Sequence, residues 1–268
     1  LLFFKVFEMP EIYQRTVVGS DGPTVVTESI DGVRSVSLGL WVRVGTRDEG
    51  PEEQGISHFV EHAVFKGTDS RDAFGIANSL ESLGGSLDAF TSRDVTCYHA
   101  RCLDEDLEIA LDVLADLVQN ATFLPNEIDK ERRVILEEIQ SVEDTPEDLI
   151  HDLFAQSVWG RHPVGSPILG TPETVNAITR DDLDRFVQAH YQSENVIISA
   201  AGNLDHDRVV QSVAEKFASP KSAEPVFRDI PLKTPRSFQH YHRDIGQTHF
   251  CLGTTAWSYV HPRQYDLL

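Results

Sequence analysis

Apolar and polar residues alternate with a period of two in several short stretches, which is the pattern of half-buried β-strands. Residues 35–45 (SVSLGLWVRVG) show it most clearly, and residues 15–29 are typical of two short strands around an Asp-Gly turn. Further strands are predicted at 86–92 and 95–103, and a continuous apolar run predicts a buried strand at 195–204.

Apolar positions spaced three and four residues apart predict helices between and after these strands. The most amphipathic helix spans residues 104–121, with acidic residues in its first turn, where the helix dipole favours them. Ser70 and Thr145 are predicted N-caps, and Gly67 is placed to end a helix. The other helices are predicted at 52–67, 70–85, 124–144, 145–160, 179–191 and 205–220.

The order of these elements also predicts the domain organisation. Strands that alternate with helices indicate an α/β or α+β fold, and we expect α+β, with a mixed, mostly antiparallel sheet covered by helices. Residues 9–225 would form the first domain, and 161–179, rich in Pro, Gly and Thr, a loop within it. Residues 226–234 would be a Pro-containing linker, and 235–268 the incomplete start of a second domain with strands at 236–244 and 247–259. Residues 1–8, upstream of the only methionine, are expected to be translated upstream sequence or an expression remnant, and a buried N-terminal strand edge is the alternative.

Composition narrows the class of partner. With 268 residues, 40% hydrophobic and 25% charged, the chain is typical of a soluble globular protein. A net charge of −20 argues against nucleic acid or a membrane as partner and favours basic peptides. A plainly solvated acidic surface is the alternative. Three cysteines in no metal or redox spacing favour the reducing cytoplasm.

The stretch His58-Phe59-Val60-Glu61-His62 places two histidines and a glutamate on one helical face. Two imidazoles one turn apart can bind one Zn²⁺ through neutral ring nitrogens, with Glu61 near enough to act on a water at the metal. The order H-x-x-E-H is the inverted form of the zincin motif. The plain alternative is a pair of surface histidines beside an acid.

A third protein ligand is expected on the helix at 124–144, where Glu137 and Glu138 are adjacent. Steps of about 100° per residue place Glu138 and Glu131 on the apolar face and Glu137 on the solvent face. We therefore predict Glu138 as the third ligand and Glu131 as an acid that orients a ligand histidine. An ion pair with Lys or Arg is the alternative for Glu131. The predicted apolar face contains Ile128, Val134, Ile135, Ile139 and Val142, and Leu136 does not fit the division.

Together these segments resemble the pitrilysin-type inverzincin zinc metallopeptidases, which include bacterial homologues of the mitochondrial processing peptidase β subunit. The separation of His62 and Glu138 is 138 − 62 = 76 residues, close to the family's spacing. The resemblance extends from residue 10 to about residue 260. The matching segments are GISHFVEHAVFKGT, SLGGSLDAFTSRDVTCYHARCL, ERRVILEEI and PVGSPILGTPETVNAIT.

The resemblance implies a zinc-dependent endopeptidase that hydrolyses short or unfolded peptides. One Zn²⁺ per chain would be held by His58, His62 and Glu138, and Glu61 would move the proton between water and the leaving amine. In family members the substrate peptide joins a sheet as an added edge strand. This β-augmentation reads the peptide backbone more than its side chains, so such enzymes accept varied substrate sequences. The segment expected to bind substrate in this way is Ser86, Leu87, Asp88, Ala89, Phe90 and Thr91.

Departures from the family qualify this expectation. Asp88 stands where the family usually has Asn, so it would hold a basic substrate residue instead of donating a hydrogen bond. Family members also close a chamber with a second homologous half or subunit, which carries an Arg and a Tyr that steady the substrate carbonyl. We expect that half to be missing here, and cleavage by this chain alone to be slow.

Two other readings remain open at this point. The chain could be a non-catalytic structural or substrate-binding subunit of the same family, although degenerate members lose the ligands that are intact here. A globular protein without metal would leave Glu131 and Glu138 buried with no partner. For residues 86–91, an ordinary hairpin strand is the alternative.

Overall fold

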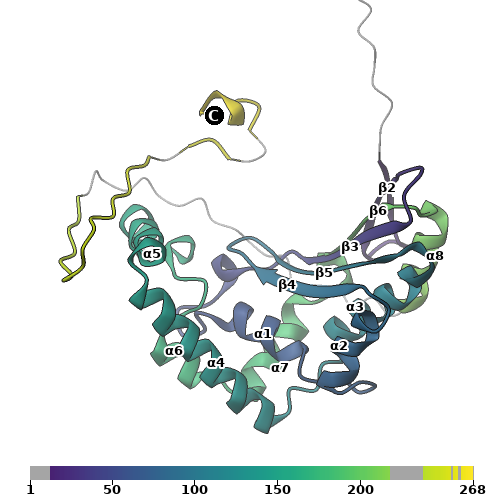
Figure 1. Cartoon of the computed structure of the whole chain (residues 1–268), viewed down its shortest axis with the longest axis horizontal. Coiled ribbons are helices and arrows are strands. Elements are labelled where there is room, and N and C mark those ends of the chain that lie inside the picture. Colours follow the sequence, from purple (N-terminus) through teal and green to yellow (C-terminus); the bar gives the residue numbers. More distant parts are fainter. Residues whose placement is uncertain (1–12, 218–237, 255, 259–260, 268) are drawn as a thin grey trace, which may run out of the picture.

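A six-stranded sheet forms the core of the computed structural model, which describes residues 13–217, 238–254, 256–258 and 261–267 (Figure 1). The strands are β1 (Gln14–Val17), β2 (Thr24–Ser29), β3 (Ser35–Val42), β4 (Ser86–Thr91), β5 (Thr96–Leu103) and β6 (Val196–Gly202). Their order is β1-β2-β6-β3-β5-β4, with β2 and β6 parallel and the other neighbours antiparallel. The predicted α+β class with a mixed, mostly antiparallel sheet is confirmed.

The helices follow the predicted periodicity closely. They are α1 (Ile56–Val64), α2 (Ala73–Glu81), α3 (Leu107–Asn120), α4 (Pro125–Asp144), α5 (Pro146–Trp159), α6 (Pro172–Ala177), α7 (Arg180–His190) and α8 (His206–Lys216). Short 3-10 helices are η1 (Thr46–Asp48), η2 (Asp104–Asp106), η3 (Pro163–Gly165), η4 (Ser193–Asn195) and η5 (Gln264–Leu267). Within the described residues, no helix is long and apolar enough to cross a membrane.

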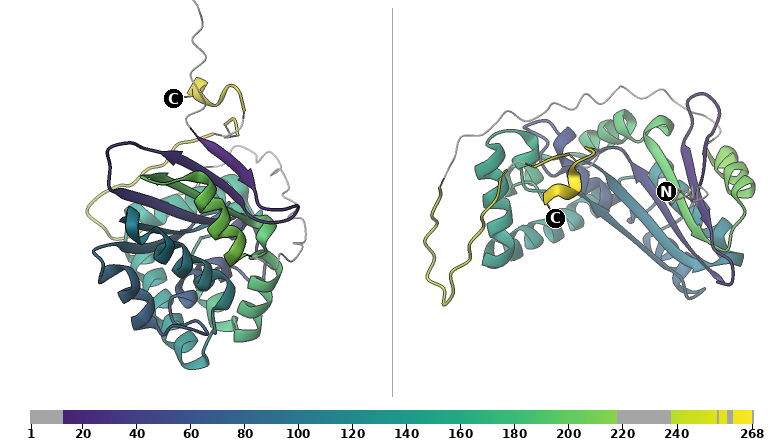
Figure 2. Two further views of the ribbon diagram at one scale, coloured as in Figure 1. Left: turned by 90° about the vertical axis from the view of Figure 1, so that its right-hand side faces the viewer. Right: turned by 90° about the horizontal axis from the view of Figure 1, so that it is seen from above.

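Helices α1, α2, α3 and α8 pack on one face of the sheet, and α4 packs on α1 on the side away from the sheet (Figures 1 and 2). In β3 the alternation predicted from sequence is real, since Val36, Leu38 and Leu40 are buried against the helices while Ser35 and Ser37 are exposed. The two edges of the sheet are β1 and β4. The hydrophobic core therefore lies between the sheet and the helices. The outer side of β4 is unpaired among the described strands.

The opposite face of the sheet is more polar and is hollowed. It lines an open depression of about 530 Å³. Trp41 lies in it with its indole N–H donating to Ser199 at 2.9 Å, and Phe90 packs edge-on against Trp41 with ring centroids 5.7 Å apart. His99 and Arg101 of β5 belong to the same face.

Local boundaries differ from the prediction at three places. Helix α2 begins at Ala73 and is capped by Asp72, which accepts from the backbone N–H of Gly75 at 2.7 Å, so the predicted N-cap Ser70 is wrong. Thr145 does precede α5, but its hydroxyl donates to the carbonyl of Ser141. The predicted loop 161–179 contains the short helix α6. Thr171 caps this helix by accepting from the backbone N–H of Thr174.

The predicted second domain, residues 235–268, lies only partly within the described residues. The described parts of 236–244 and 247–259 contain no strand, so these strand predictions are wrong there, because a strand needs a hydrogen-bonded partner. Contacts place this stretch beside α4 and α5, since Arg243 donates to the carbonyl of Glu143 and the Cys251 sulfur lies 4.0 Å from Nδ1 of His151. Residues 1–8, the predicted linker 226–234 and the predicted boundary at residue 225 lie outside the described residues.

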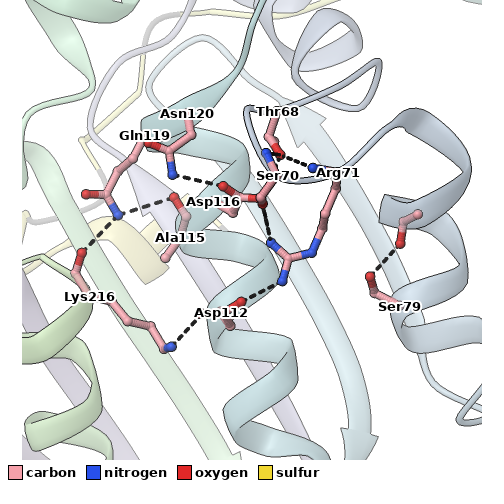
Figure 3. A network of polar contacts seen from close by, with 11 residues as sticks. Thr68, Ser70, Arg71, Ser79, Asp112, Ala115, Asp116, Gln119, Asn120 and Lys216 are labelled. Carbon is pink, nitrogen blue, oxygen red and sulfur yellow. Dashed lines mark hydrogen bonds and ion pairs between the residues drawn. The ribbon is translucent and has the colours of Figure 1, made fainter.

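A polar network joins the turn after α1 to α3 (Figure 3). The buried carboxylate of Asp116 accepts from the hydroxyls of Thr68 and Ser70 at 2.7 Å each and from Asn120 at 2.8 Å, and it pairs with Arg71. Burial acts to raise the pKa of Asp116, but these donors hold that pKa below its usual value. The network fixes the chain between α1 and α2.

We expect Asp116→Ala to lower the free energy of unfolding by about 3 kcal/mol, because it leaves the hydroxyls of Thr68 and Ser70 without this acceptor and removes one of the two carboxylates that bind Arg71. Since the folded-state pKa is lowered, the contribution of Asp116 is present above the unfolded value of 3.8 and is lost as pH falls through the folded value. Denaturation in guanidinium would measure both effects.

Asp112 is the matched control, since it binds the same Arg71 at 2.6 Å from a half-exposed position. Asp112→Ala is expected to cost about 1 kcal/mol or less. Equal losses for the two variants would contradict the special role of Asp116.

Candidate functional site

Helix α1 carries the predicted H-x-x-E-H residues. Its apolar residues face the core, and His58 is buried with them at 8% exposure. The rings of His58 and His62 lie 4.5 Å apart between centroids. The helix ends at Val64, three residues before Gly67, which lies in the following turn with φ of 149°.

Helix α4 packs against α1 and supplies the carboxylates. The Oε2 atom of Glu138 lies 3.7 Å from Nε2 of His58 and 3.6 Å from Nε2 of His62. One potential ligand atom from each of these residues lies within 4.8 Å of the other two, so the three side chains converge on one point. Glu137, in contrast, is exposed, as the helical geometry predicted.

Glu131 combines the two roles that the sequence left as alternatives. It is buried at 7% exposure, and its Oε2 lies 3.2 Å from Nδ1 of His62. Its other oxygen forms an ion pair with Lys66 at 3.0 Å. The carboxylate thus fixes the orientation of the His62 ring while its own charge is balanced. Val134, predicted on the buried face, is 40% exposed, whereas Leu136 packs against the core.

The protonation of His58 suits a metal ligand. Burial, and then the neighbouring His62, lower the pKa of His58 to about 3. Its Nδ1 atom is buried and has no hydrogen-bond partner in the described structure. A neutral imidazole with Nε2 directed toward Glu138 is therefore the stable form, and neutral imidazole is the form that binds metals.

Glu61 points toward strand β4. The hydroxyl of Thr91 donates to its Oε2, which fixes the carboxylate beside the edge of the sheet. Burial raises the pKa of Glu61, and the bond from Thr91 acts in the opposite direction. This carboxylate is thus held next to His58, His62 and Glu138 without joining them.

Strand β4 is an edge, as predicted, and pairs only with β5 among the described strands. Its exposure alternates, with Leu87, Ala89 and Thr91 toward α1 and Ser86, Asp88 and Phe90 away from it. Asp88 accepts from the N–H of Ala89 at 2.8 Å. A small cavity of about 260 Å³ lies between the strand and α1, lined by Glu61, His62, Lys66, Leu87, Asp88 and Ala89.

Two glycines allow the N-terminus of α1 to approach a distant loop. Gly55 has φ of 91°, and a Cβ there would lie 2.6 Å from the carbonyl of Leu169. Gly170 has φ of 75°, and a Cβ there would lie 2.3 Å from the carbonyl of Gln54. The side chain of Gln54 donates to Ser166 at 2.9 Å. Part of the segment PVGSPILGTPETVNAIT therefore serves to support the helix that carries the histidines.

Sequence reasoning missed two residues that contact this site. Lys66 neutralises Glu131, and its position four residues after His62 was the available signal. Glu49 binds the backbone at the start of α1, and no local pattern marked it.

Comparison with known proteins agrees with the motifs and the fold. The profile of the family Insulinase (Peptidase family M16) matches residues 24–172, and that of the Peptidase M16 inactive domain matches residues 177–268. The chain belongs to peptidase family M16. Helix α1 and β4 both lie within the first match.

Similar proteins carry zinc protease names. An uncharacterized zinc protease of Bacillus subtilis, YmxG, is 40% identical over 92% of this chain and 60% of its own length. Another from Mycobacterium leprae is 43% identical over 87% of this chain and 53% of its own length. The structure of a Helicobacter pylori protease superposes with a TM-score of 0.76 at 23% identity, covering 82% of this chain and 53% of that one. This chain thus spans about half the length of the curated relatives that it matches.

We expect Gly55→Ala to lower the free energy of unfolding by about 3 kcal/mol, because the methyl group meets the Leu169 carbonyl and φ is positive. Gly84→Ala is the control, since Gly84 has φ of 75° but nothing lies within 4 Å of its Cβ position. That change should cost about 1 kcal/mol. Urea unfolding of both variants separates the steric clash at Gly55 from the cost of a positive φ, which the two positions share. Equal losses of unfolding free energy would contradict the close approach at Gly55.

Proposed function

We propose that this chain is the zinc-binding half of an M16 endopeptidase that hydrolyses short or unfolded peptides. The convergence of His58, His62 and Glu138, with ligand atoms within 4.8 Å of one another, is the observation that carries the proposal. Names of relatives support a zinc protease in general terms. The substrate class and the residue roles are our inference.

The donor set fits Zn²⁺. Two imidazole nitrogens and one carboxylate are ligands that zinc prefers, and three protein ligands leave a position for substrate or water. The pKa of His58, lowered to about 3, keeps its imidazole neutral. One Zn²⁺ per chain, held by His58, His62 and Glu138, would supply a Lewis acid toward the scissile carbonyl and make a nearby water more acidic.

The chain's own residues would move the proton and hold the peptide. Glu61 would take a proton from the attacking water and deliver it to the leaving amine, with Thr91 holding its carboxylate in place. The free edge of β4, Ser86–Thr91, would bind the peptide backbone as an added strand. Asp88 at that edge and the net charge of −20 favour basic peptides.

A second homologous half or subunit would complete the chamber. The chain spans 53% and 60% of the two relatives described above, which is what one half of a two-part peptidase would span. We also propose a cytoplasmic location, because the three cysteines Cys97, Cys102 and Cys251 are free thiols.

Cleavage of an unstructured basic peptide by the purified chain, with zinc content measured in parallel, tests the proposal. Glu61→Gln should lower the rate at least 100-fold while zinc remains at one per chain, because the variant loses the base but no ligand. Glu137→Gln, a neighbouring carboxylate on the solvent side of α4, should change neither quantity.

The outcomes separate the parts of the proposal. Zinc in both proteins with cleavage by neither would contradict an activity of this half alone and indicate that the site needs its second half. A wild-type chain that holds no zinc under metal-replete conditions would contradict the site itself.

A second prediction concerns Glu131. Glu131→Gln removes the negative charge beside Nδ1 of His62, so zinc affinity measured by chelator competition should fall about 10- to 100-fold. Lys66→Met leaves the bond between Glu131 and His62 in place and should have the smaller effect. An unchanged affinity for Glu131→Gln would show that Glu131 does not support the ligand.

A further inference from the structure

Glu49 is a buried carboxylate close to the start of α1, and the mechanism above does not use it. It directly follows η1 and is 5% exposed. Its Oε2 accepts from the backbone N–H of Gly55 and its Oε1 from the backbone N–H of Ser57, both at 2.9 Å. Ser57 immediately precedes His58, so the carboxylate binds the helix one residue from a histidine of the cluster.

The first turn of α1 needs such an external acceptor. The first N–H groups of a helix have no partner within it, and a side chain at the N-cap position usually accepts from one of them. Here the N-cap is Gly55, which has no side chain. No larger residue fits, because a Cβ at Gly55 would lie 2.6 Å from the Leu169 carbonyl. Glu49, six residues upstream, takes the place of the missing cap.

The other side of Glu49 is tied to strand β4. In η1, the N–H of Thr46 donates to the carbonyl of Ser92 at 3.2 Å, and that of Arg47 donates to the carbonyl of Arg93 at 3.1 Å. Ser92 follows Thr91, whose hydroxyl binds Glu61. The segment that carries Glu49 is therefore bonded to the backbone next to the residue that holds the proposed base.

We propose that Glu49 is a positioning residue for the metal site: its carboxylate locks the N-terminus of α1 to the turn after β4. This lock sets the direction of His58 and the approach of Glu61 to Thr91 together. The inference rests on the proposed function, because it assigns Glu49 a role only toward a site that binds zinc.

Burial also changes the charge that Glu49 carries near neutral pH. Burial raises the pKa of Glu49 to about 7, against the bonds from Ser57 and Gly55 that lower it. A raised folded-state pKa means that stability decreases as pH rises from 4.5 through 7, so the ionised carboxylate costs stability at neutral pH.

The test measures the metal site and stability separately. Glu49→Gln keeps the side-chain length but offers one acceptor in place of two, and Glu49→Ala offers none. Zinc affinity by chelator competition, and the visible absorption spectrum after Co²⁺ substitution, report the ligand geometry. We expect about 10-fold weaker zinc binding and an altered Co²⁺ spectrum in Glu49→Ala, with Glu49→Gln recovering part of both.

Asp205→Ala is the matched control. Asp205 caps α8 by accepting from the N–H of Arg208 at 2.9 Å, and α8 packs on α3 and β2. This variant should lower the unfolding midpoint while zinc affinity and the Co²⁺ spectrum stay as in the wild type. If Glu49→Ala does not fold, Glu49→Gln decides the question alone.

Two results would overturn the inference in distinguishable ways. If the Glu49 variants lower the unfolding midpoint but keep wild-type zinc affinity and Co²⁺ spectrum, Glu49 serves folding only, and the proposed function is unaffected. If the wild-type chain itself binds no zinc, the proposed function fails, and the role of Glu49 fails with it.

Discussion

The packing of α1 against α4 is the constraint on which the rest of the site depends. Histidines from one helix and a glutamate from the other must meet within a few ångströms, so a shift of one helix along the other would separate them. Arg132 of α4 helps to fix this packing, because its guanidinium lies 5.3 Å from the ring centroid of Phe59 in α1. The same guanidinium donates to the carbonyls of Val175 and Ile178 at the end of α6.

The N-terminus of α1 is held as firmly as its contact with α4. Glu49 binds it from one side, and the Gly55–Gly170 contact brings a loop more than 100 residues away against the other side. The close approach of the two backbones leaves no room for a side chain at Gly55, so an ordinary side-chain cap at that position is excluded. The glycines, the buried glutamate and the loop therefore all contact the start of the helix that carries His58.

The sequence predicted those parts of the site that depend on local periodicity. The helical repeat separated the buried Glu131 from the exposed Glu137, but Glu138, expected to be buried, is half-buried with 40% of its side chain exposed. The covered face of α4 is rotated relative to the predicted one, since Val134 is exposed and Leu136 packs against the core. Contacts between residues far apart in sequence were not predictable. Glu49 caps a helix from six residues upstream, whereas known capping patterns use the residue just before the helix. For the same reason the hydroxyl of Ser70 was misassigned, since its partner, Asp116, is 46 residues away.

Successive side chains of strand β4 point to opposite faces of the sheet, so the strand makes contacts on both faces. Thr91 points toward α1 and holds Glu61, while the adjacent Phe90 points to the other face and packs on Trp41. A slip of one residue in the pairing with β5 would exchange these two side chains, which would remove the hydroxyl from Glu61 and place an aromatic ring there. The Phe90–Trp41 contact therefore supports the register of the edge strand, and through that register it keeps the Glu61 carboxylate beside His58, His62 and Glu138.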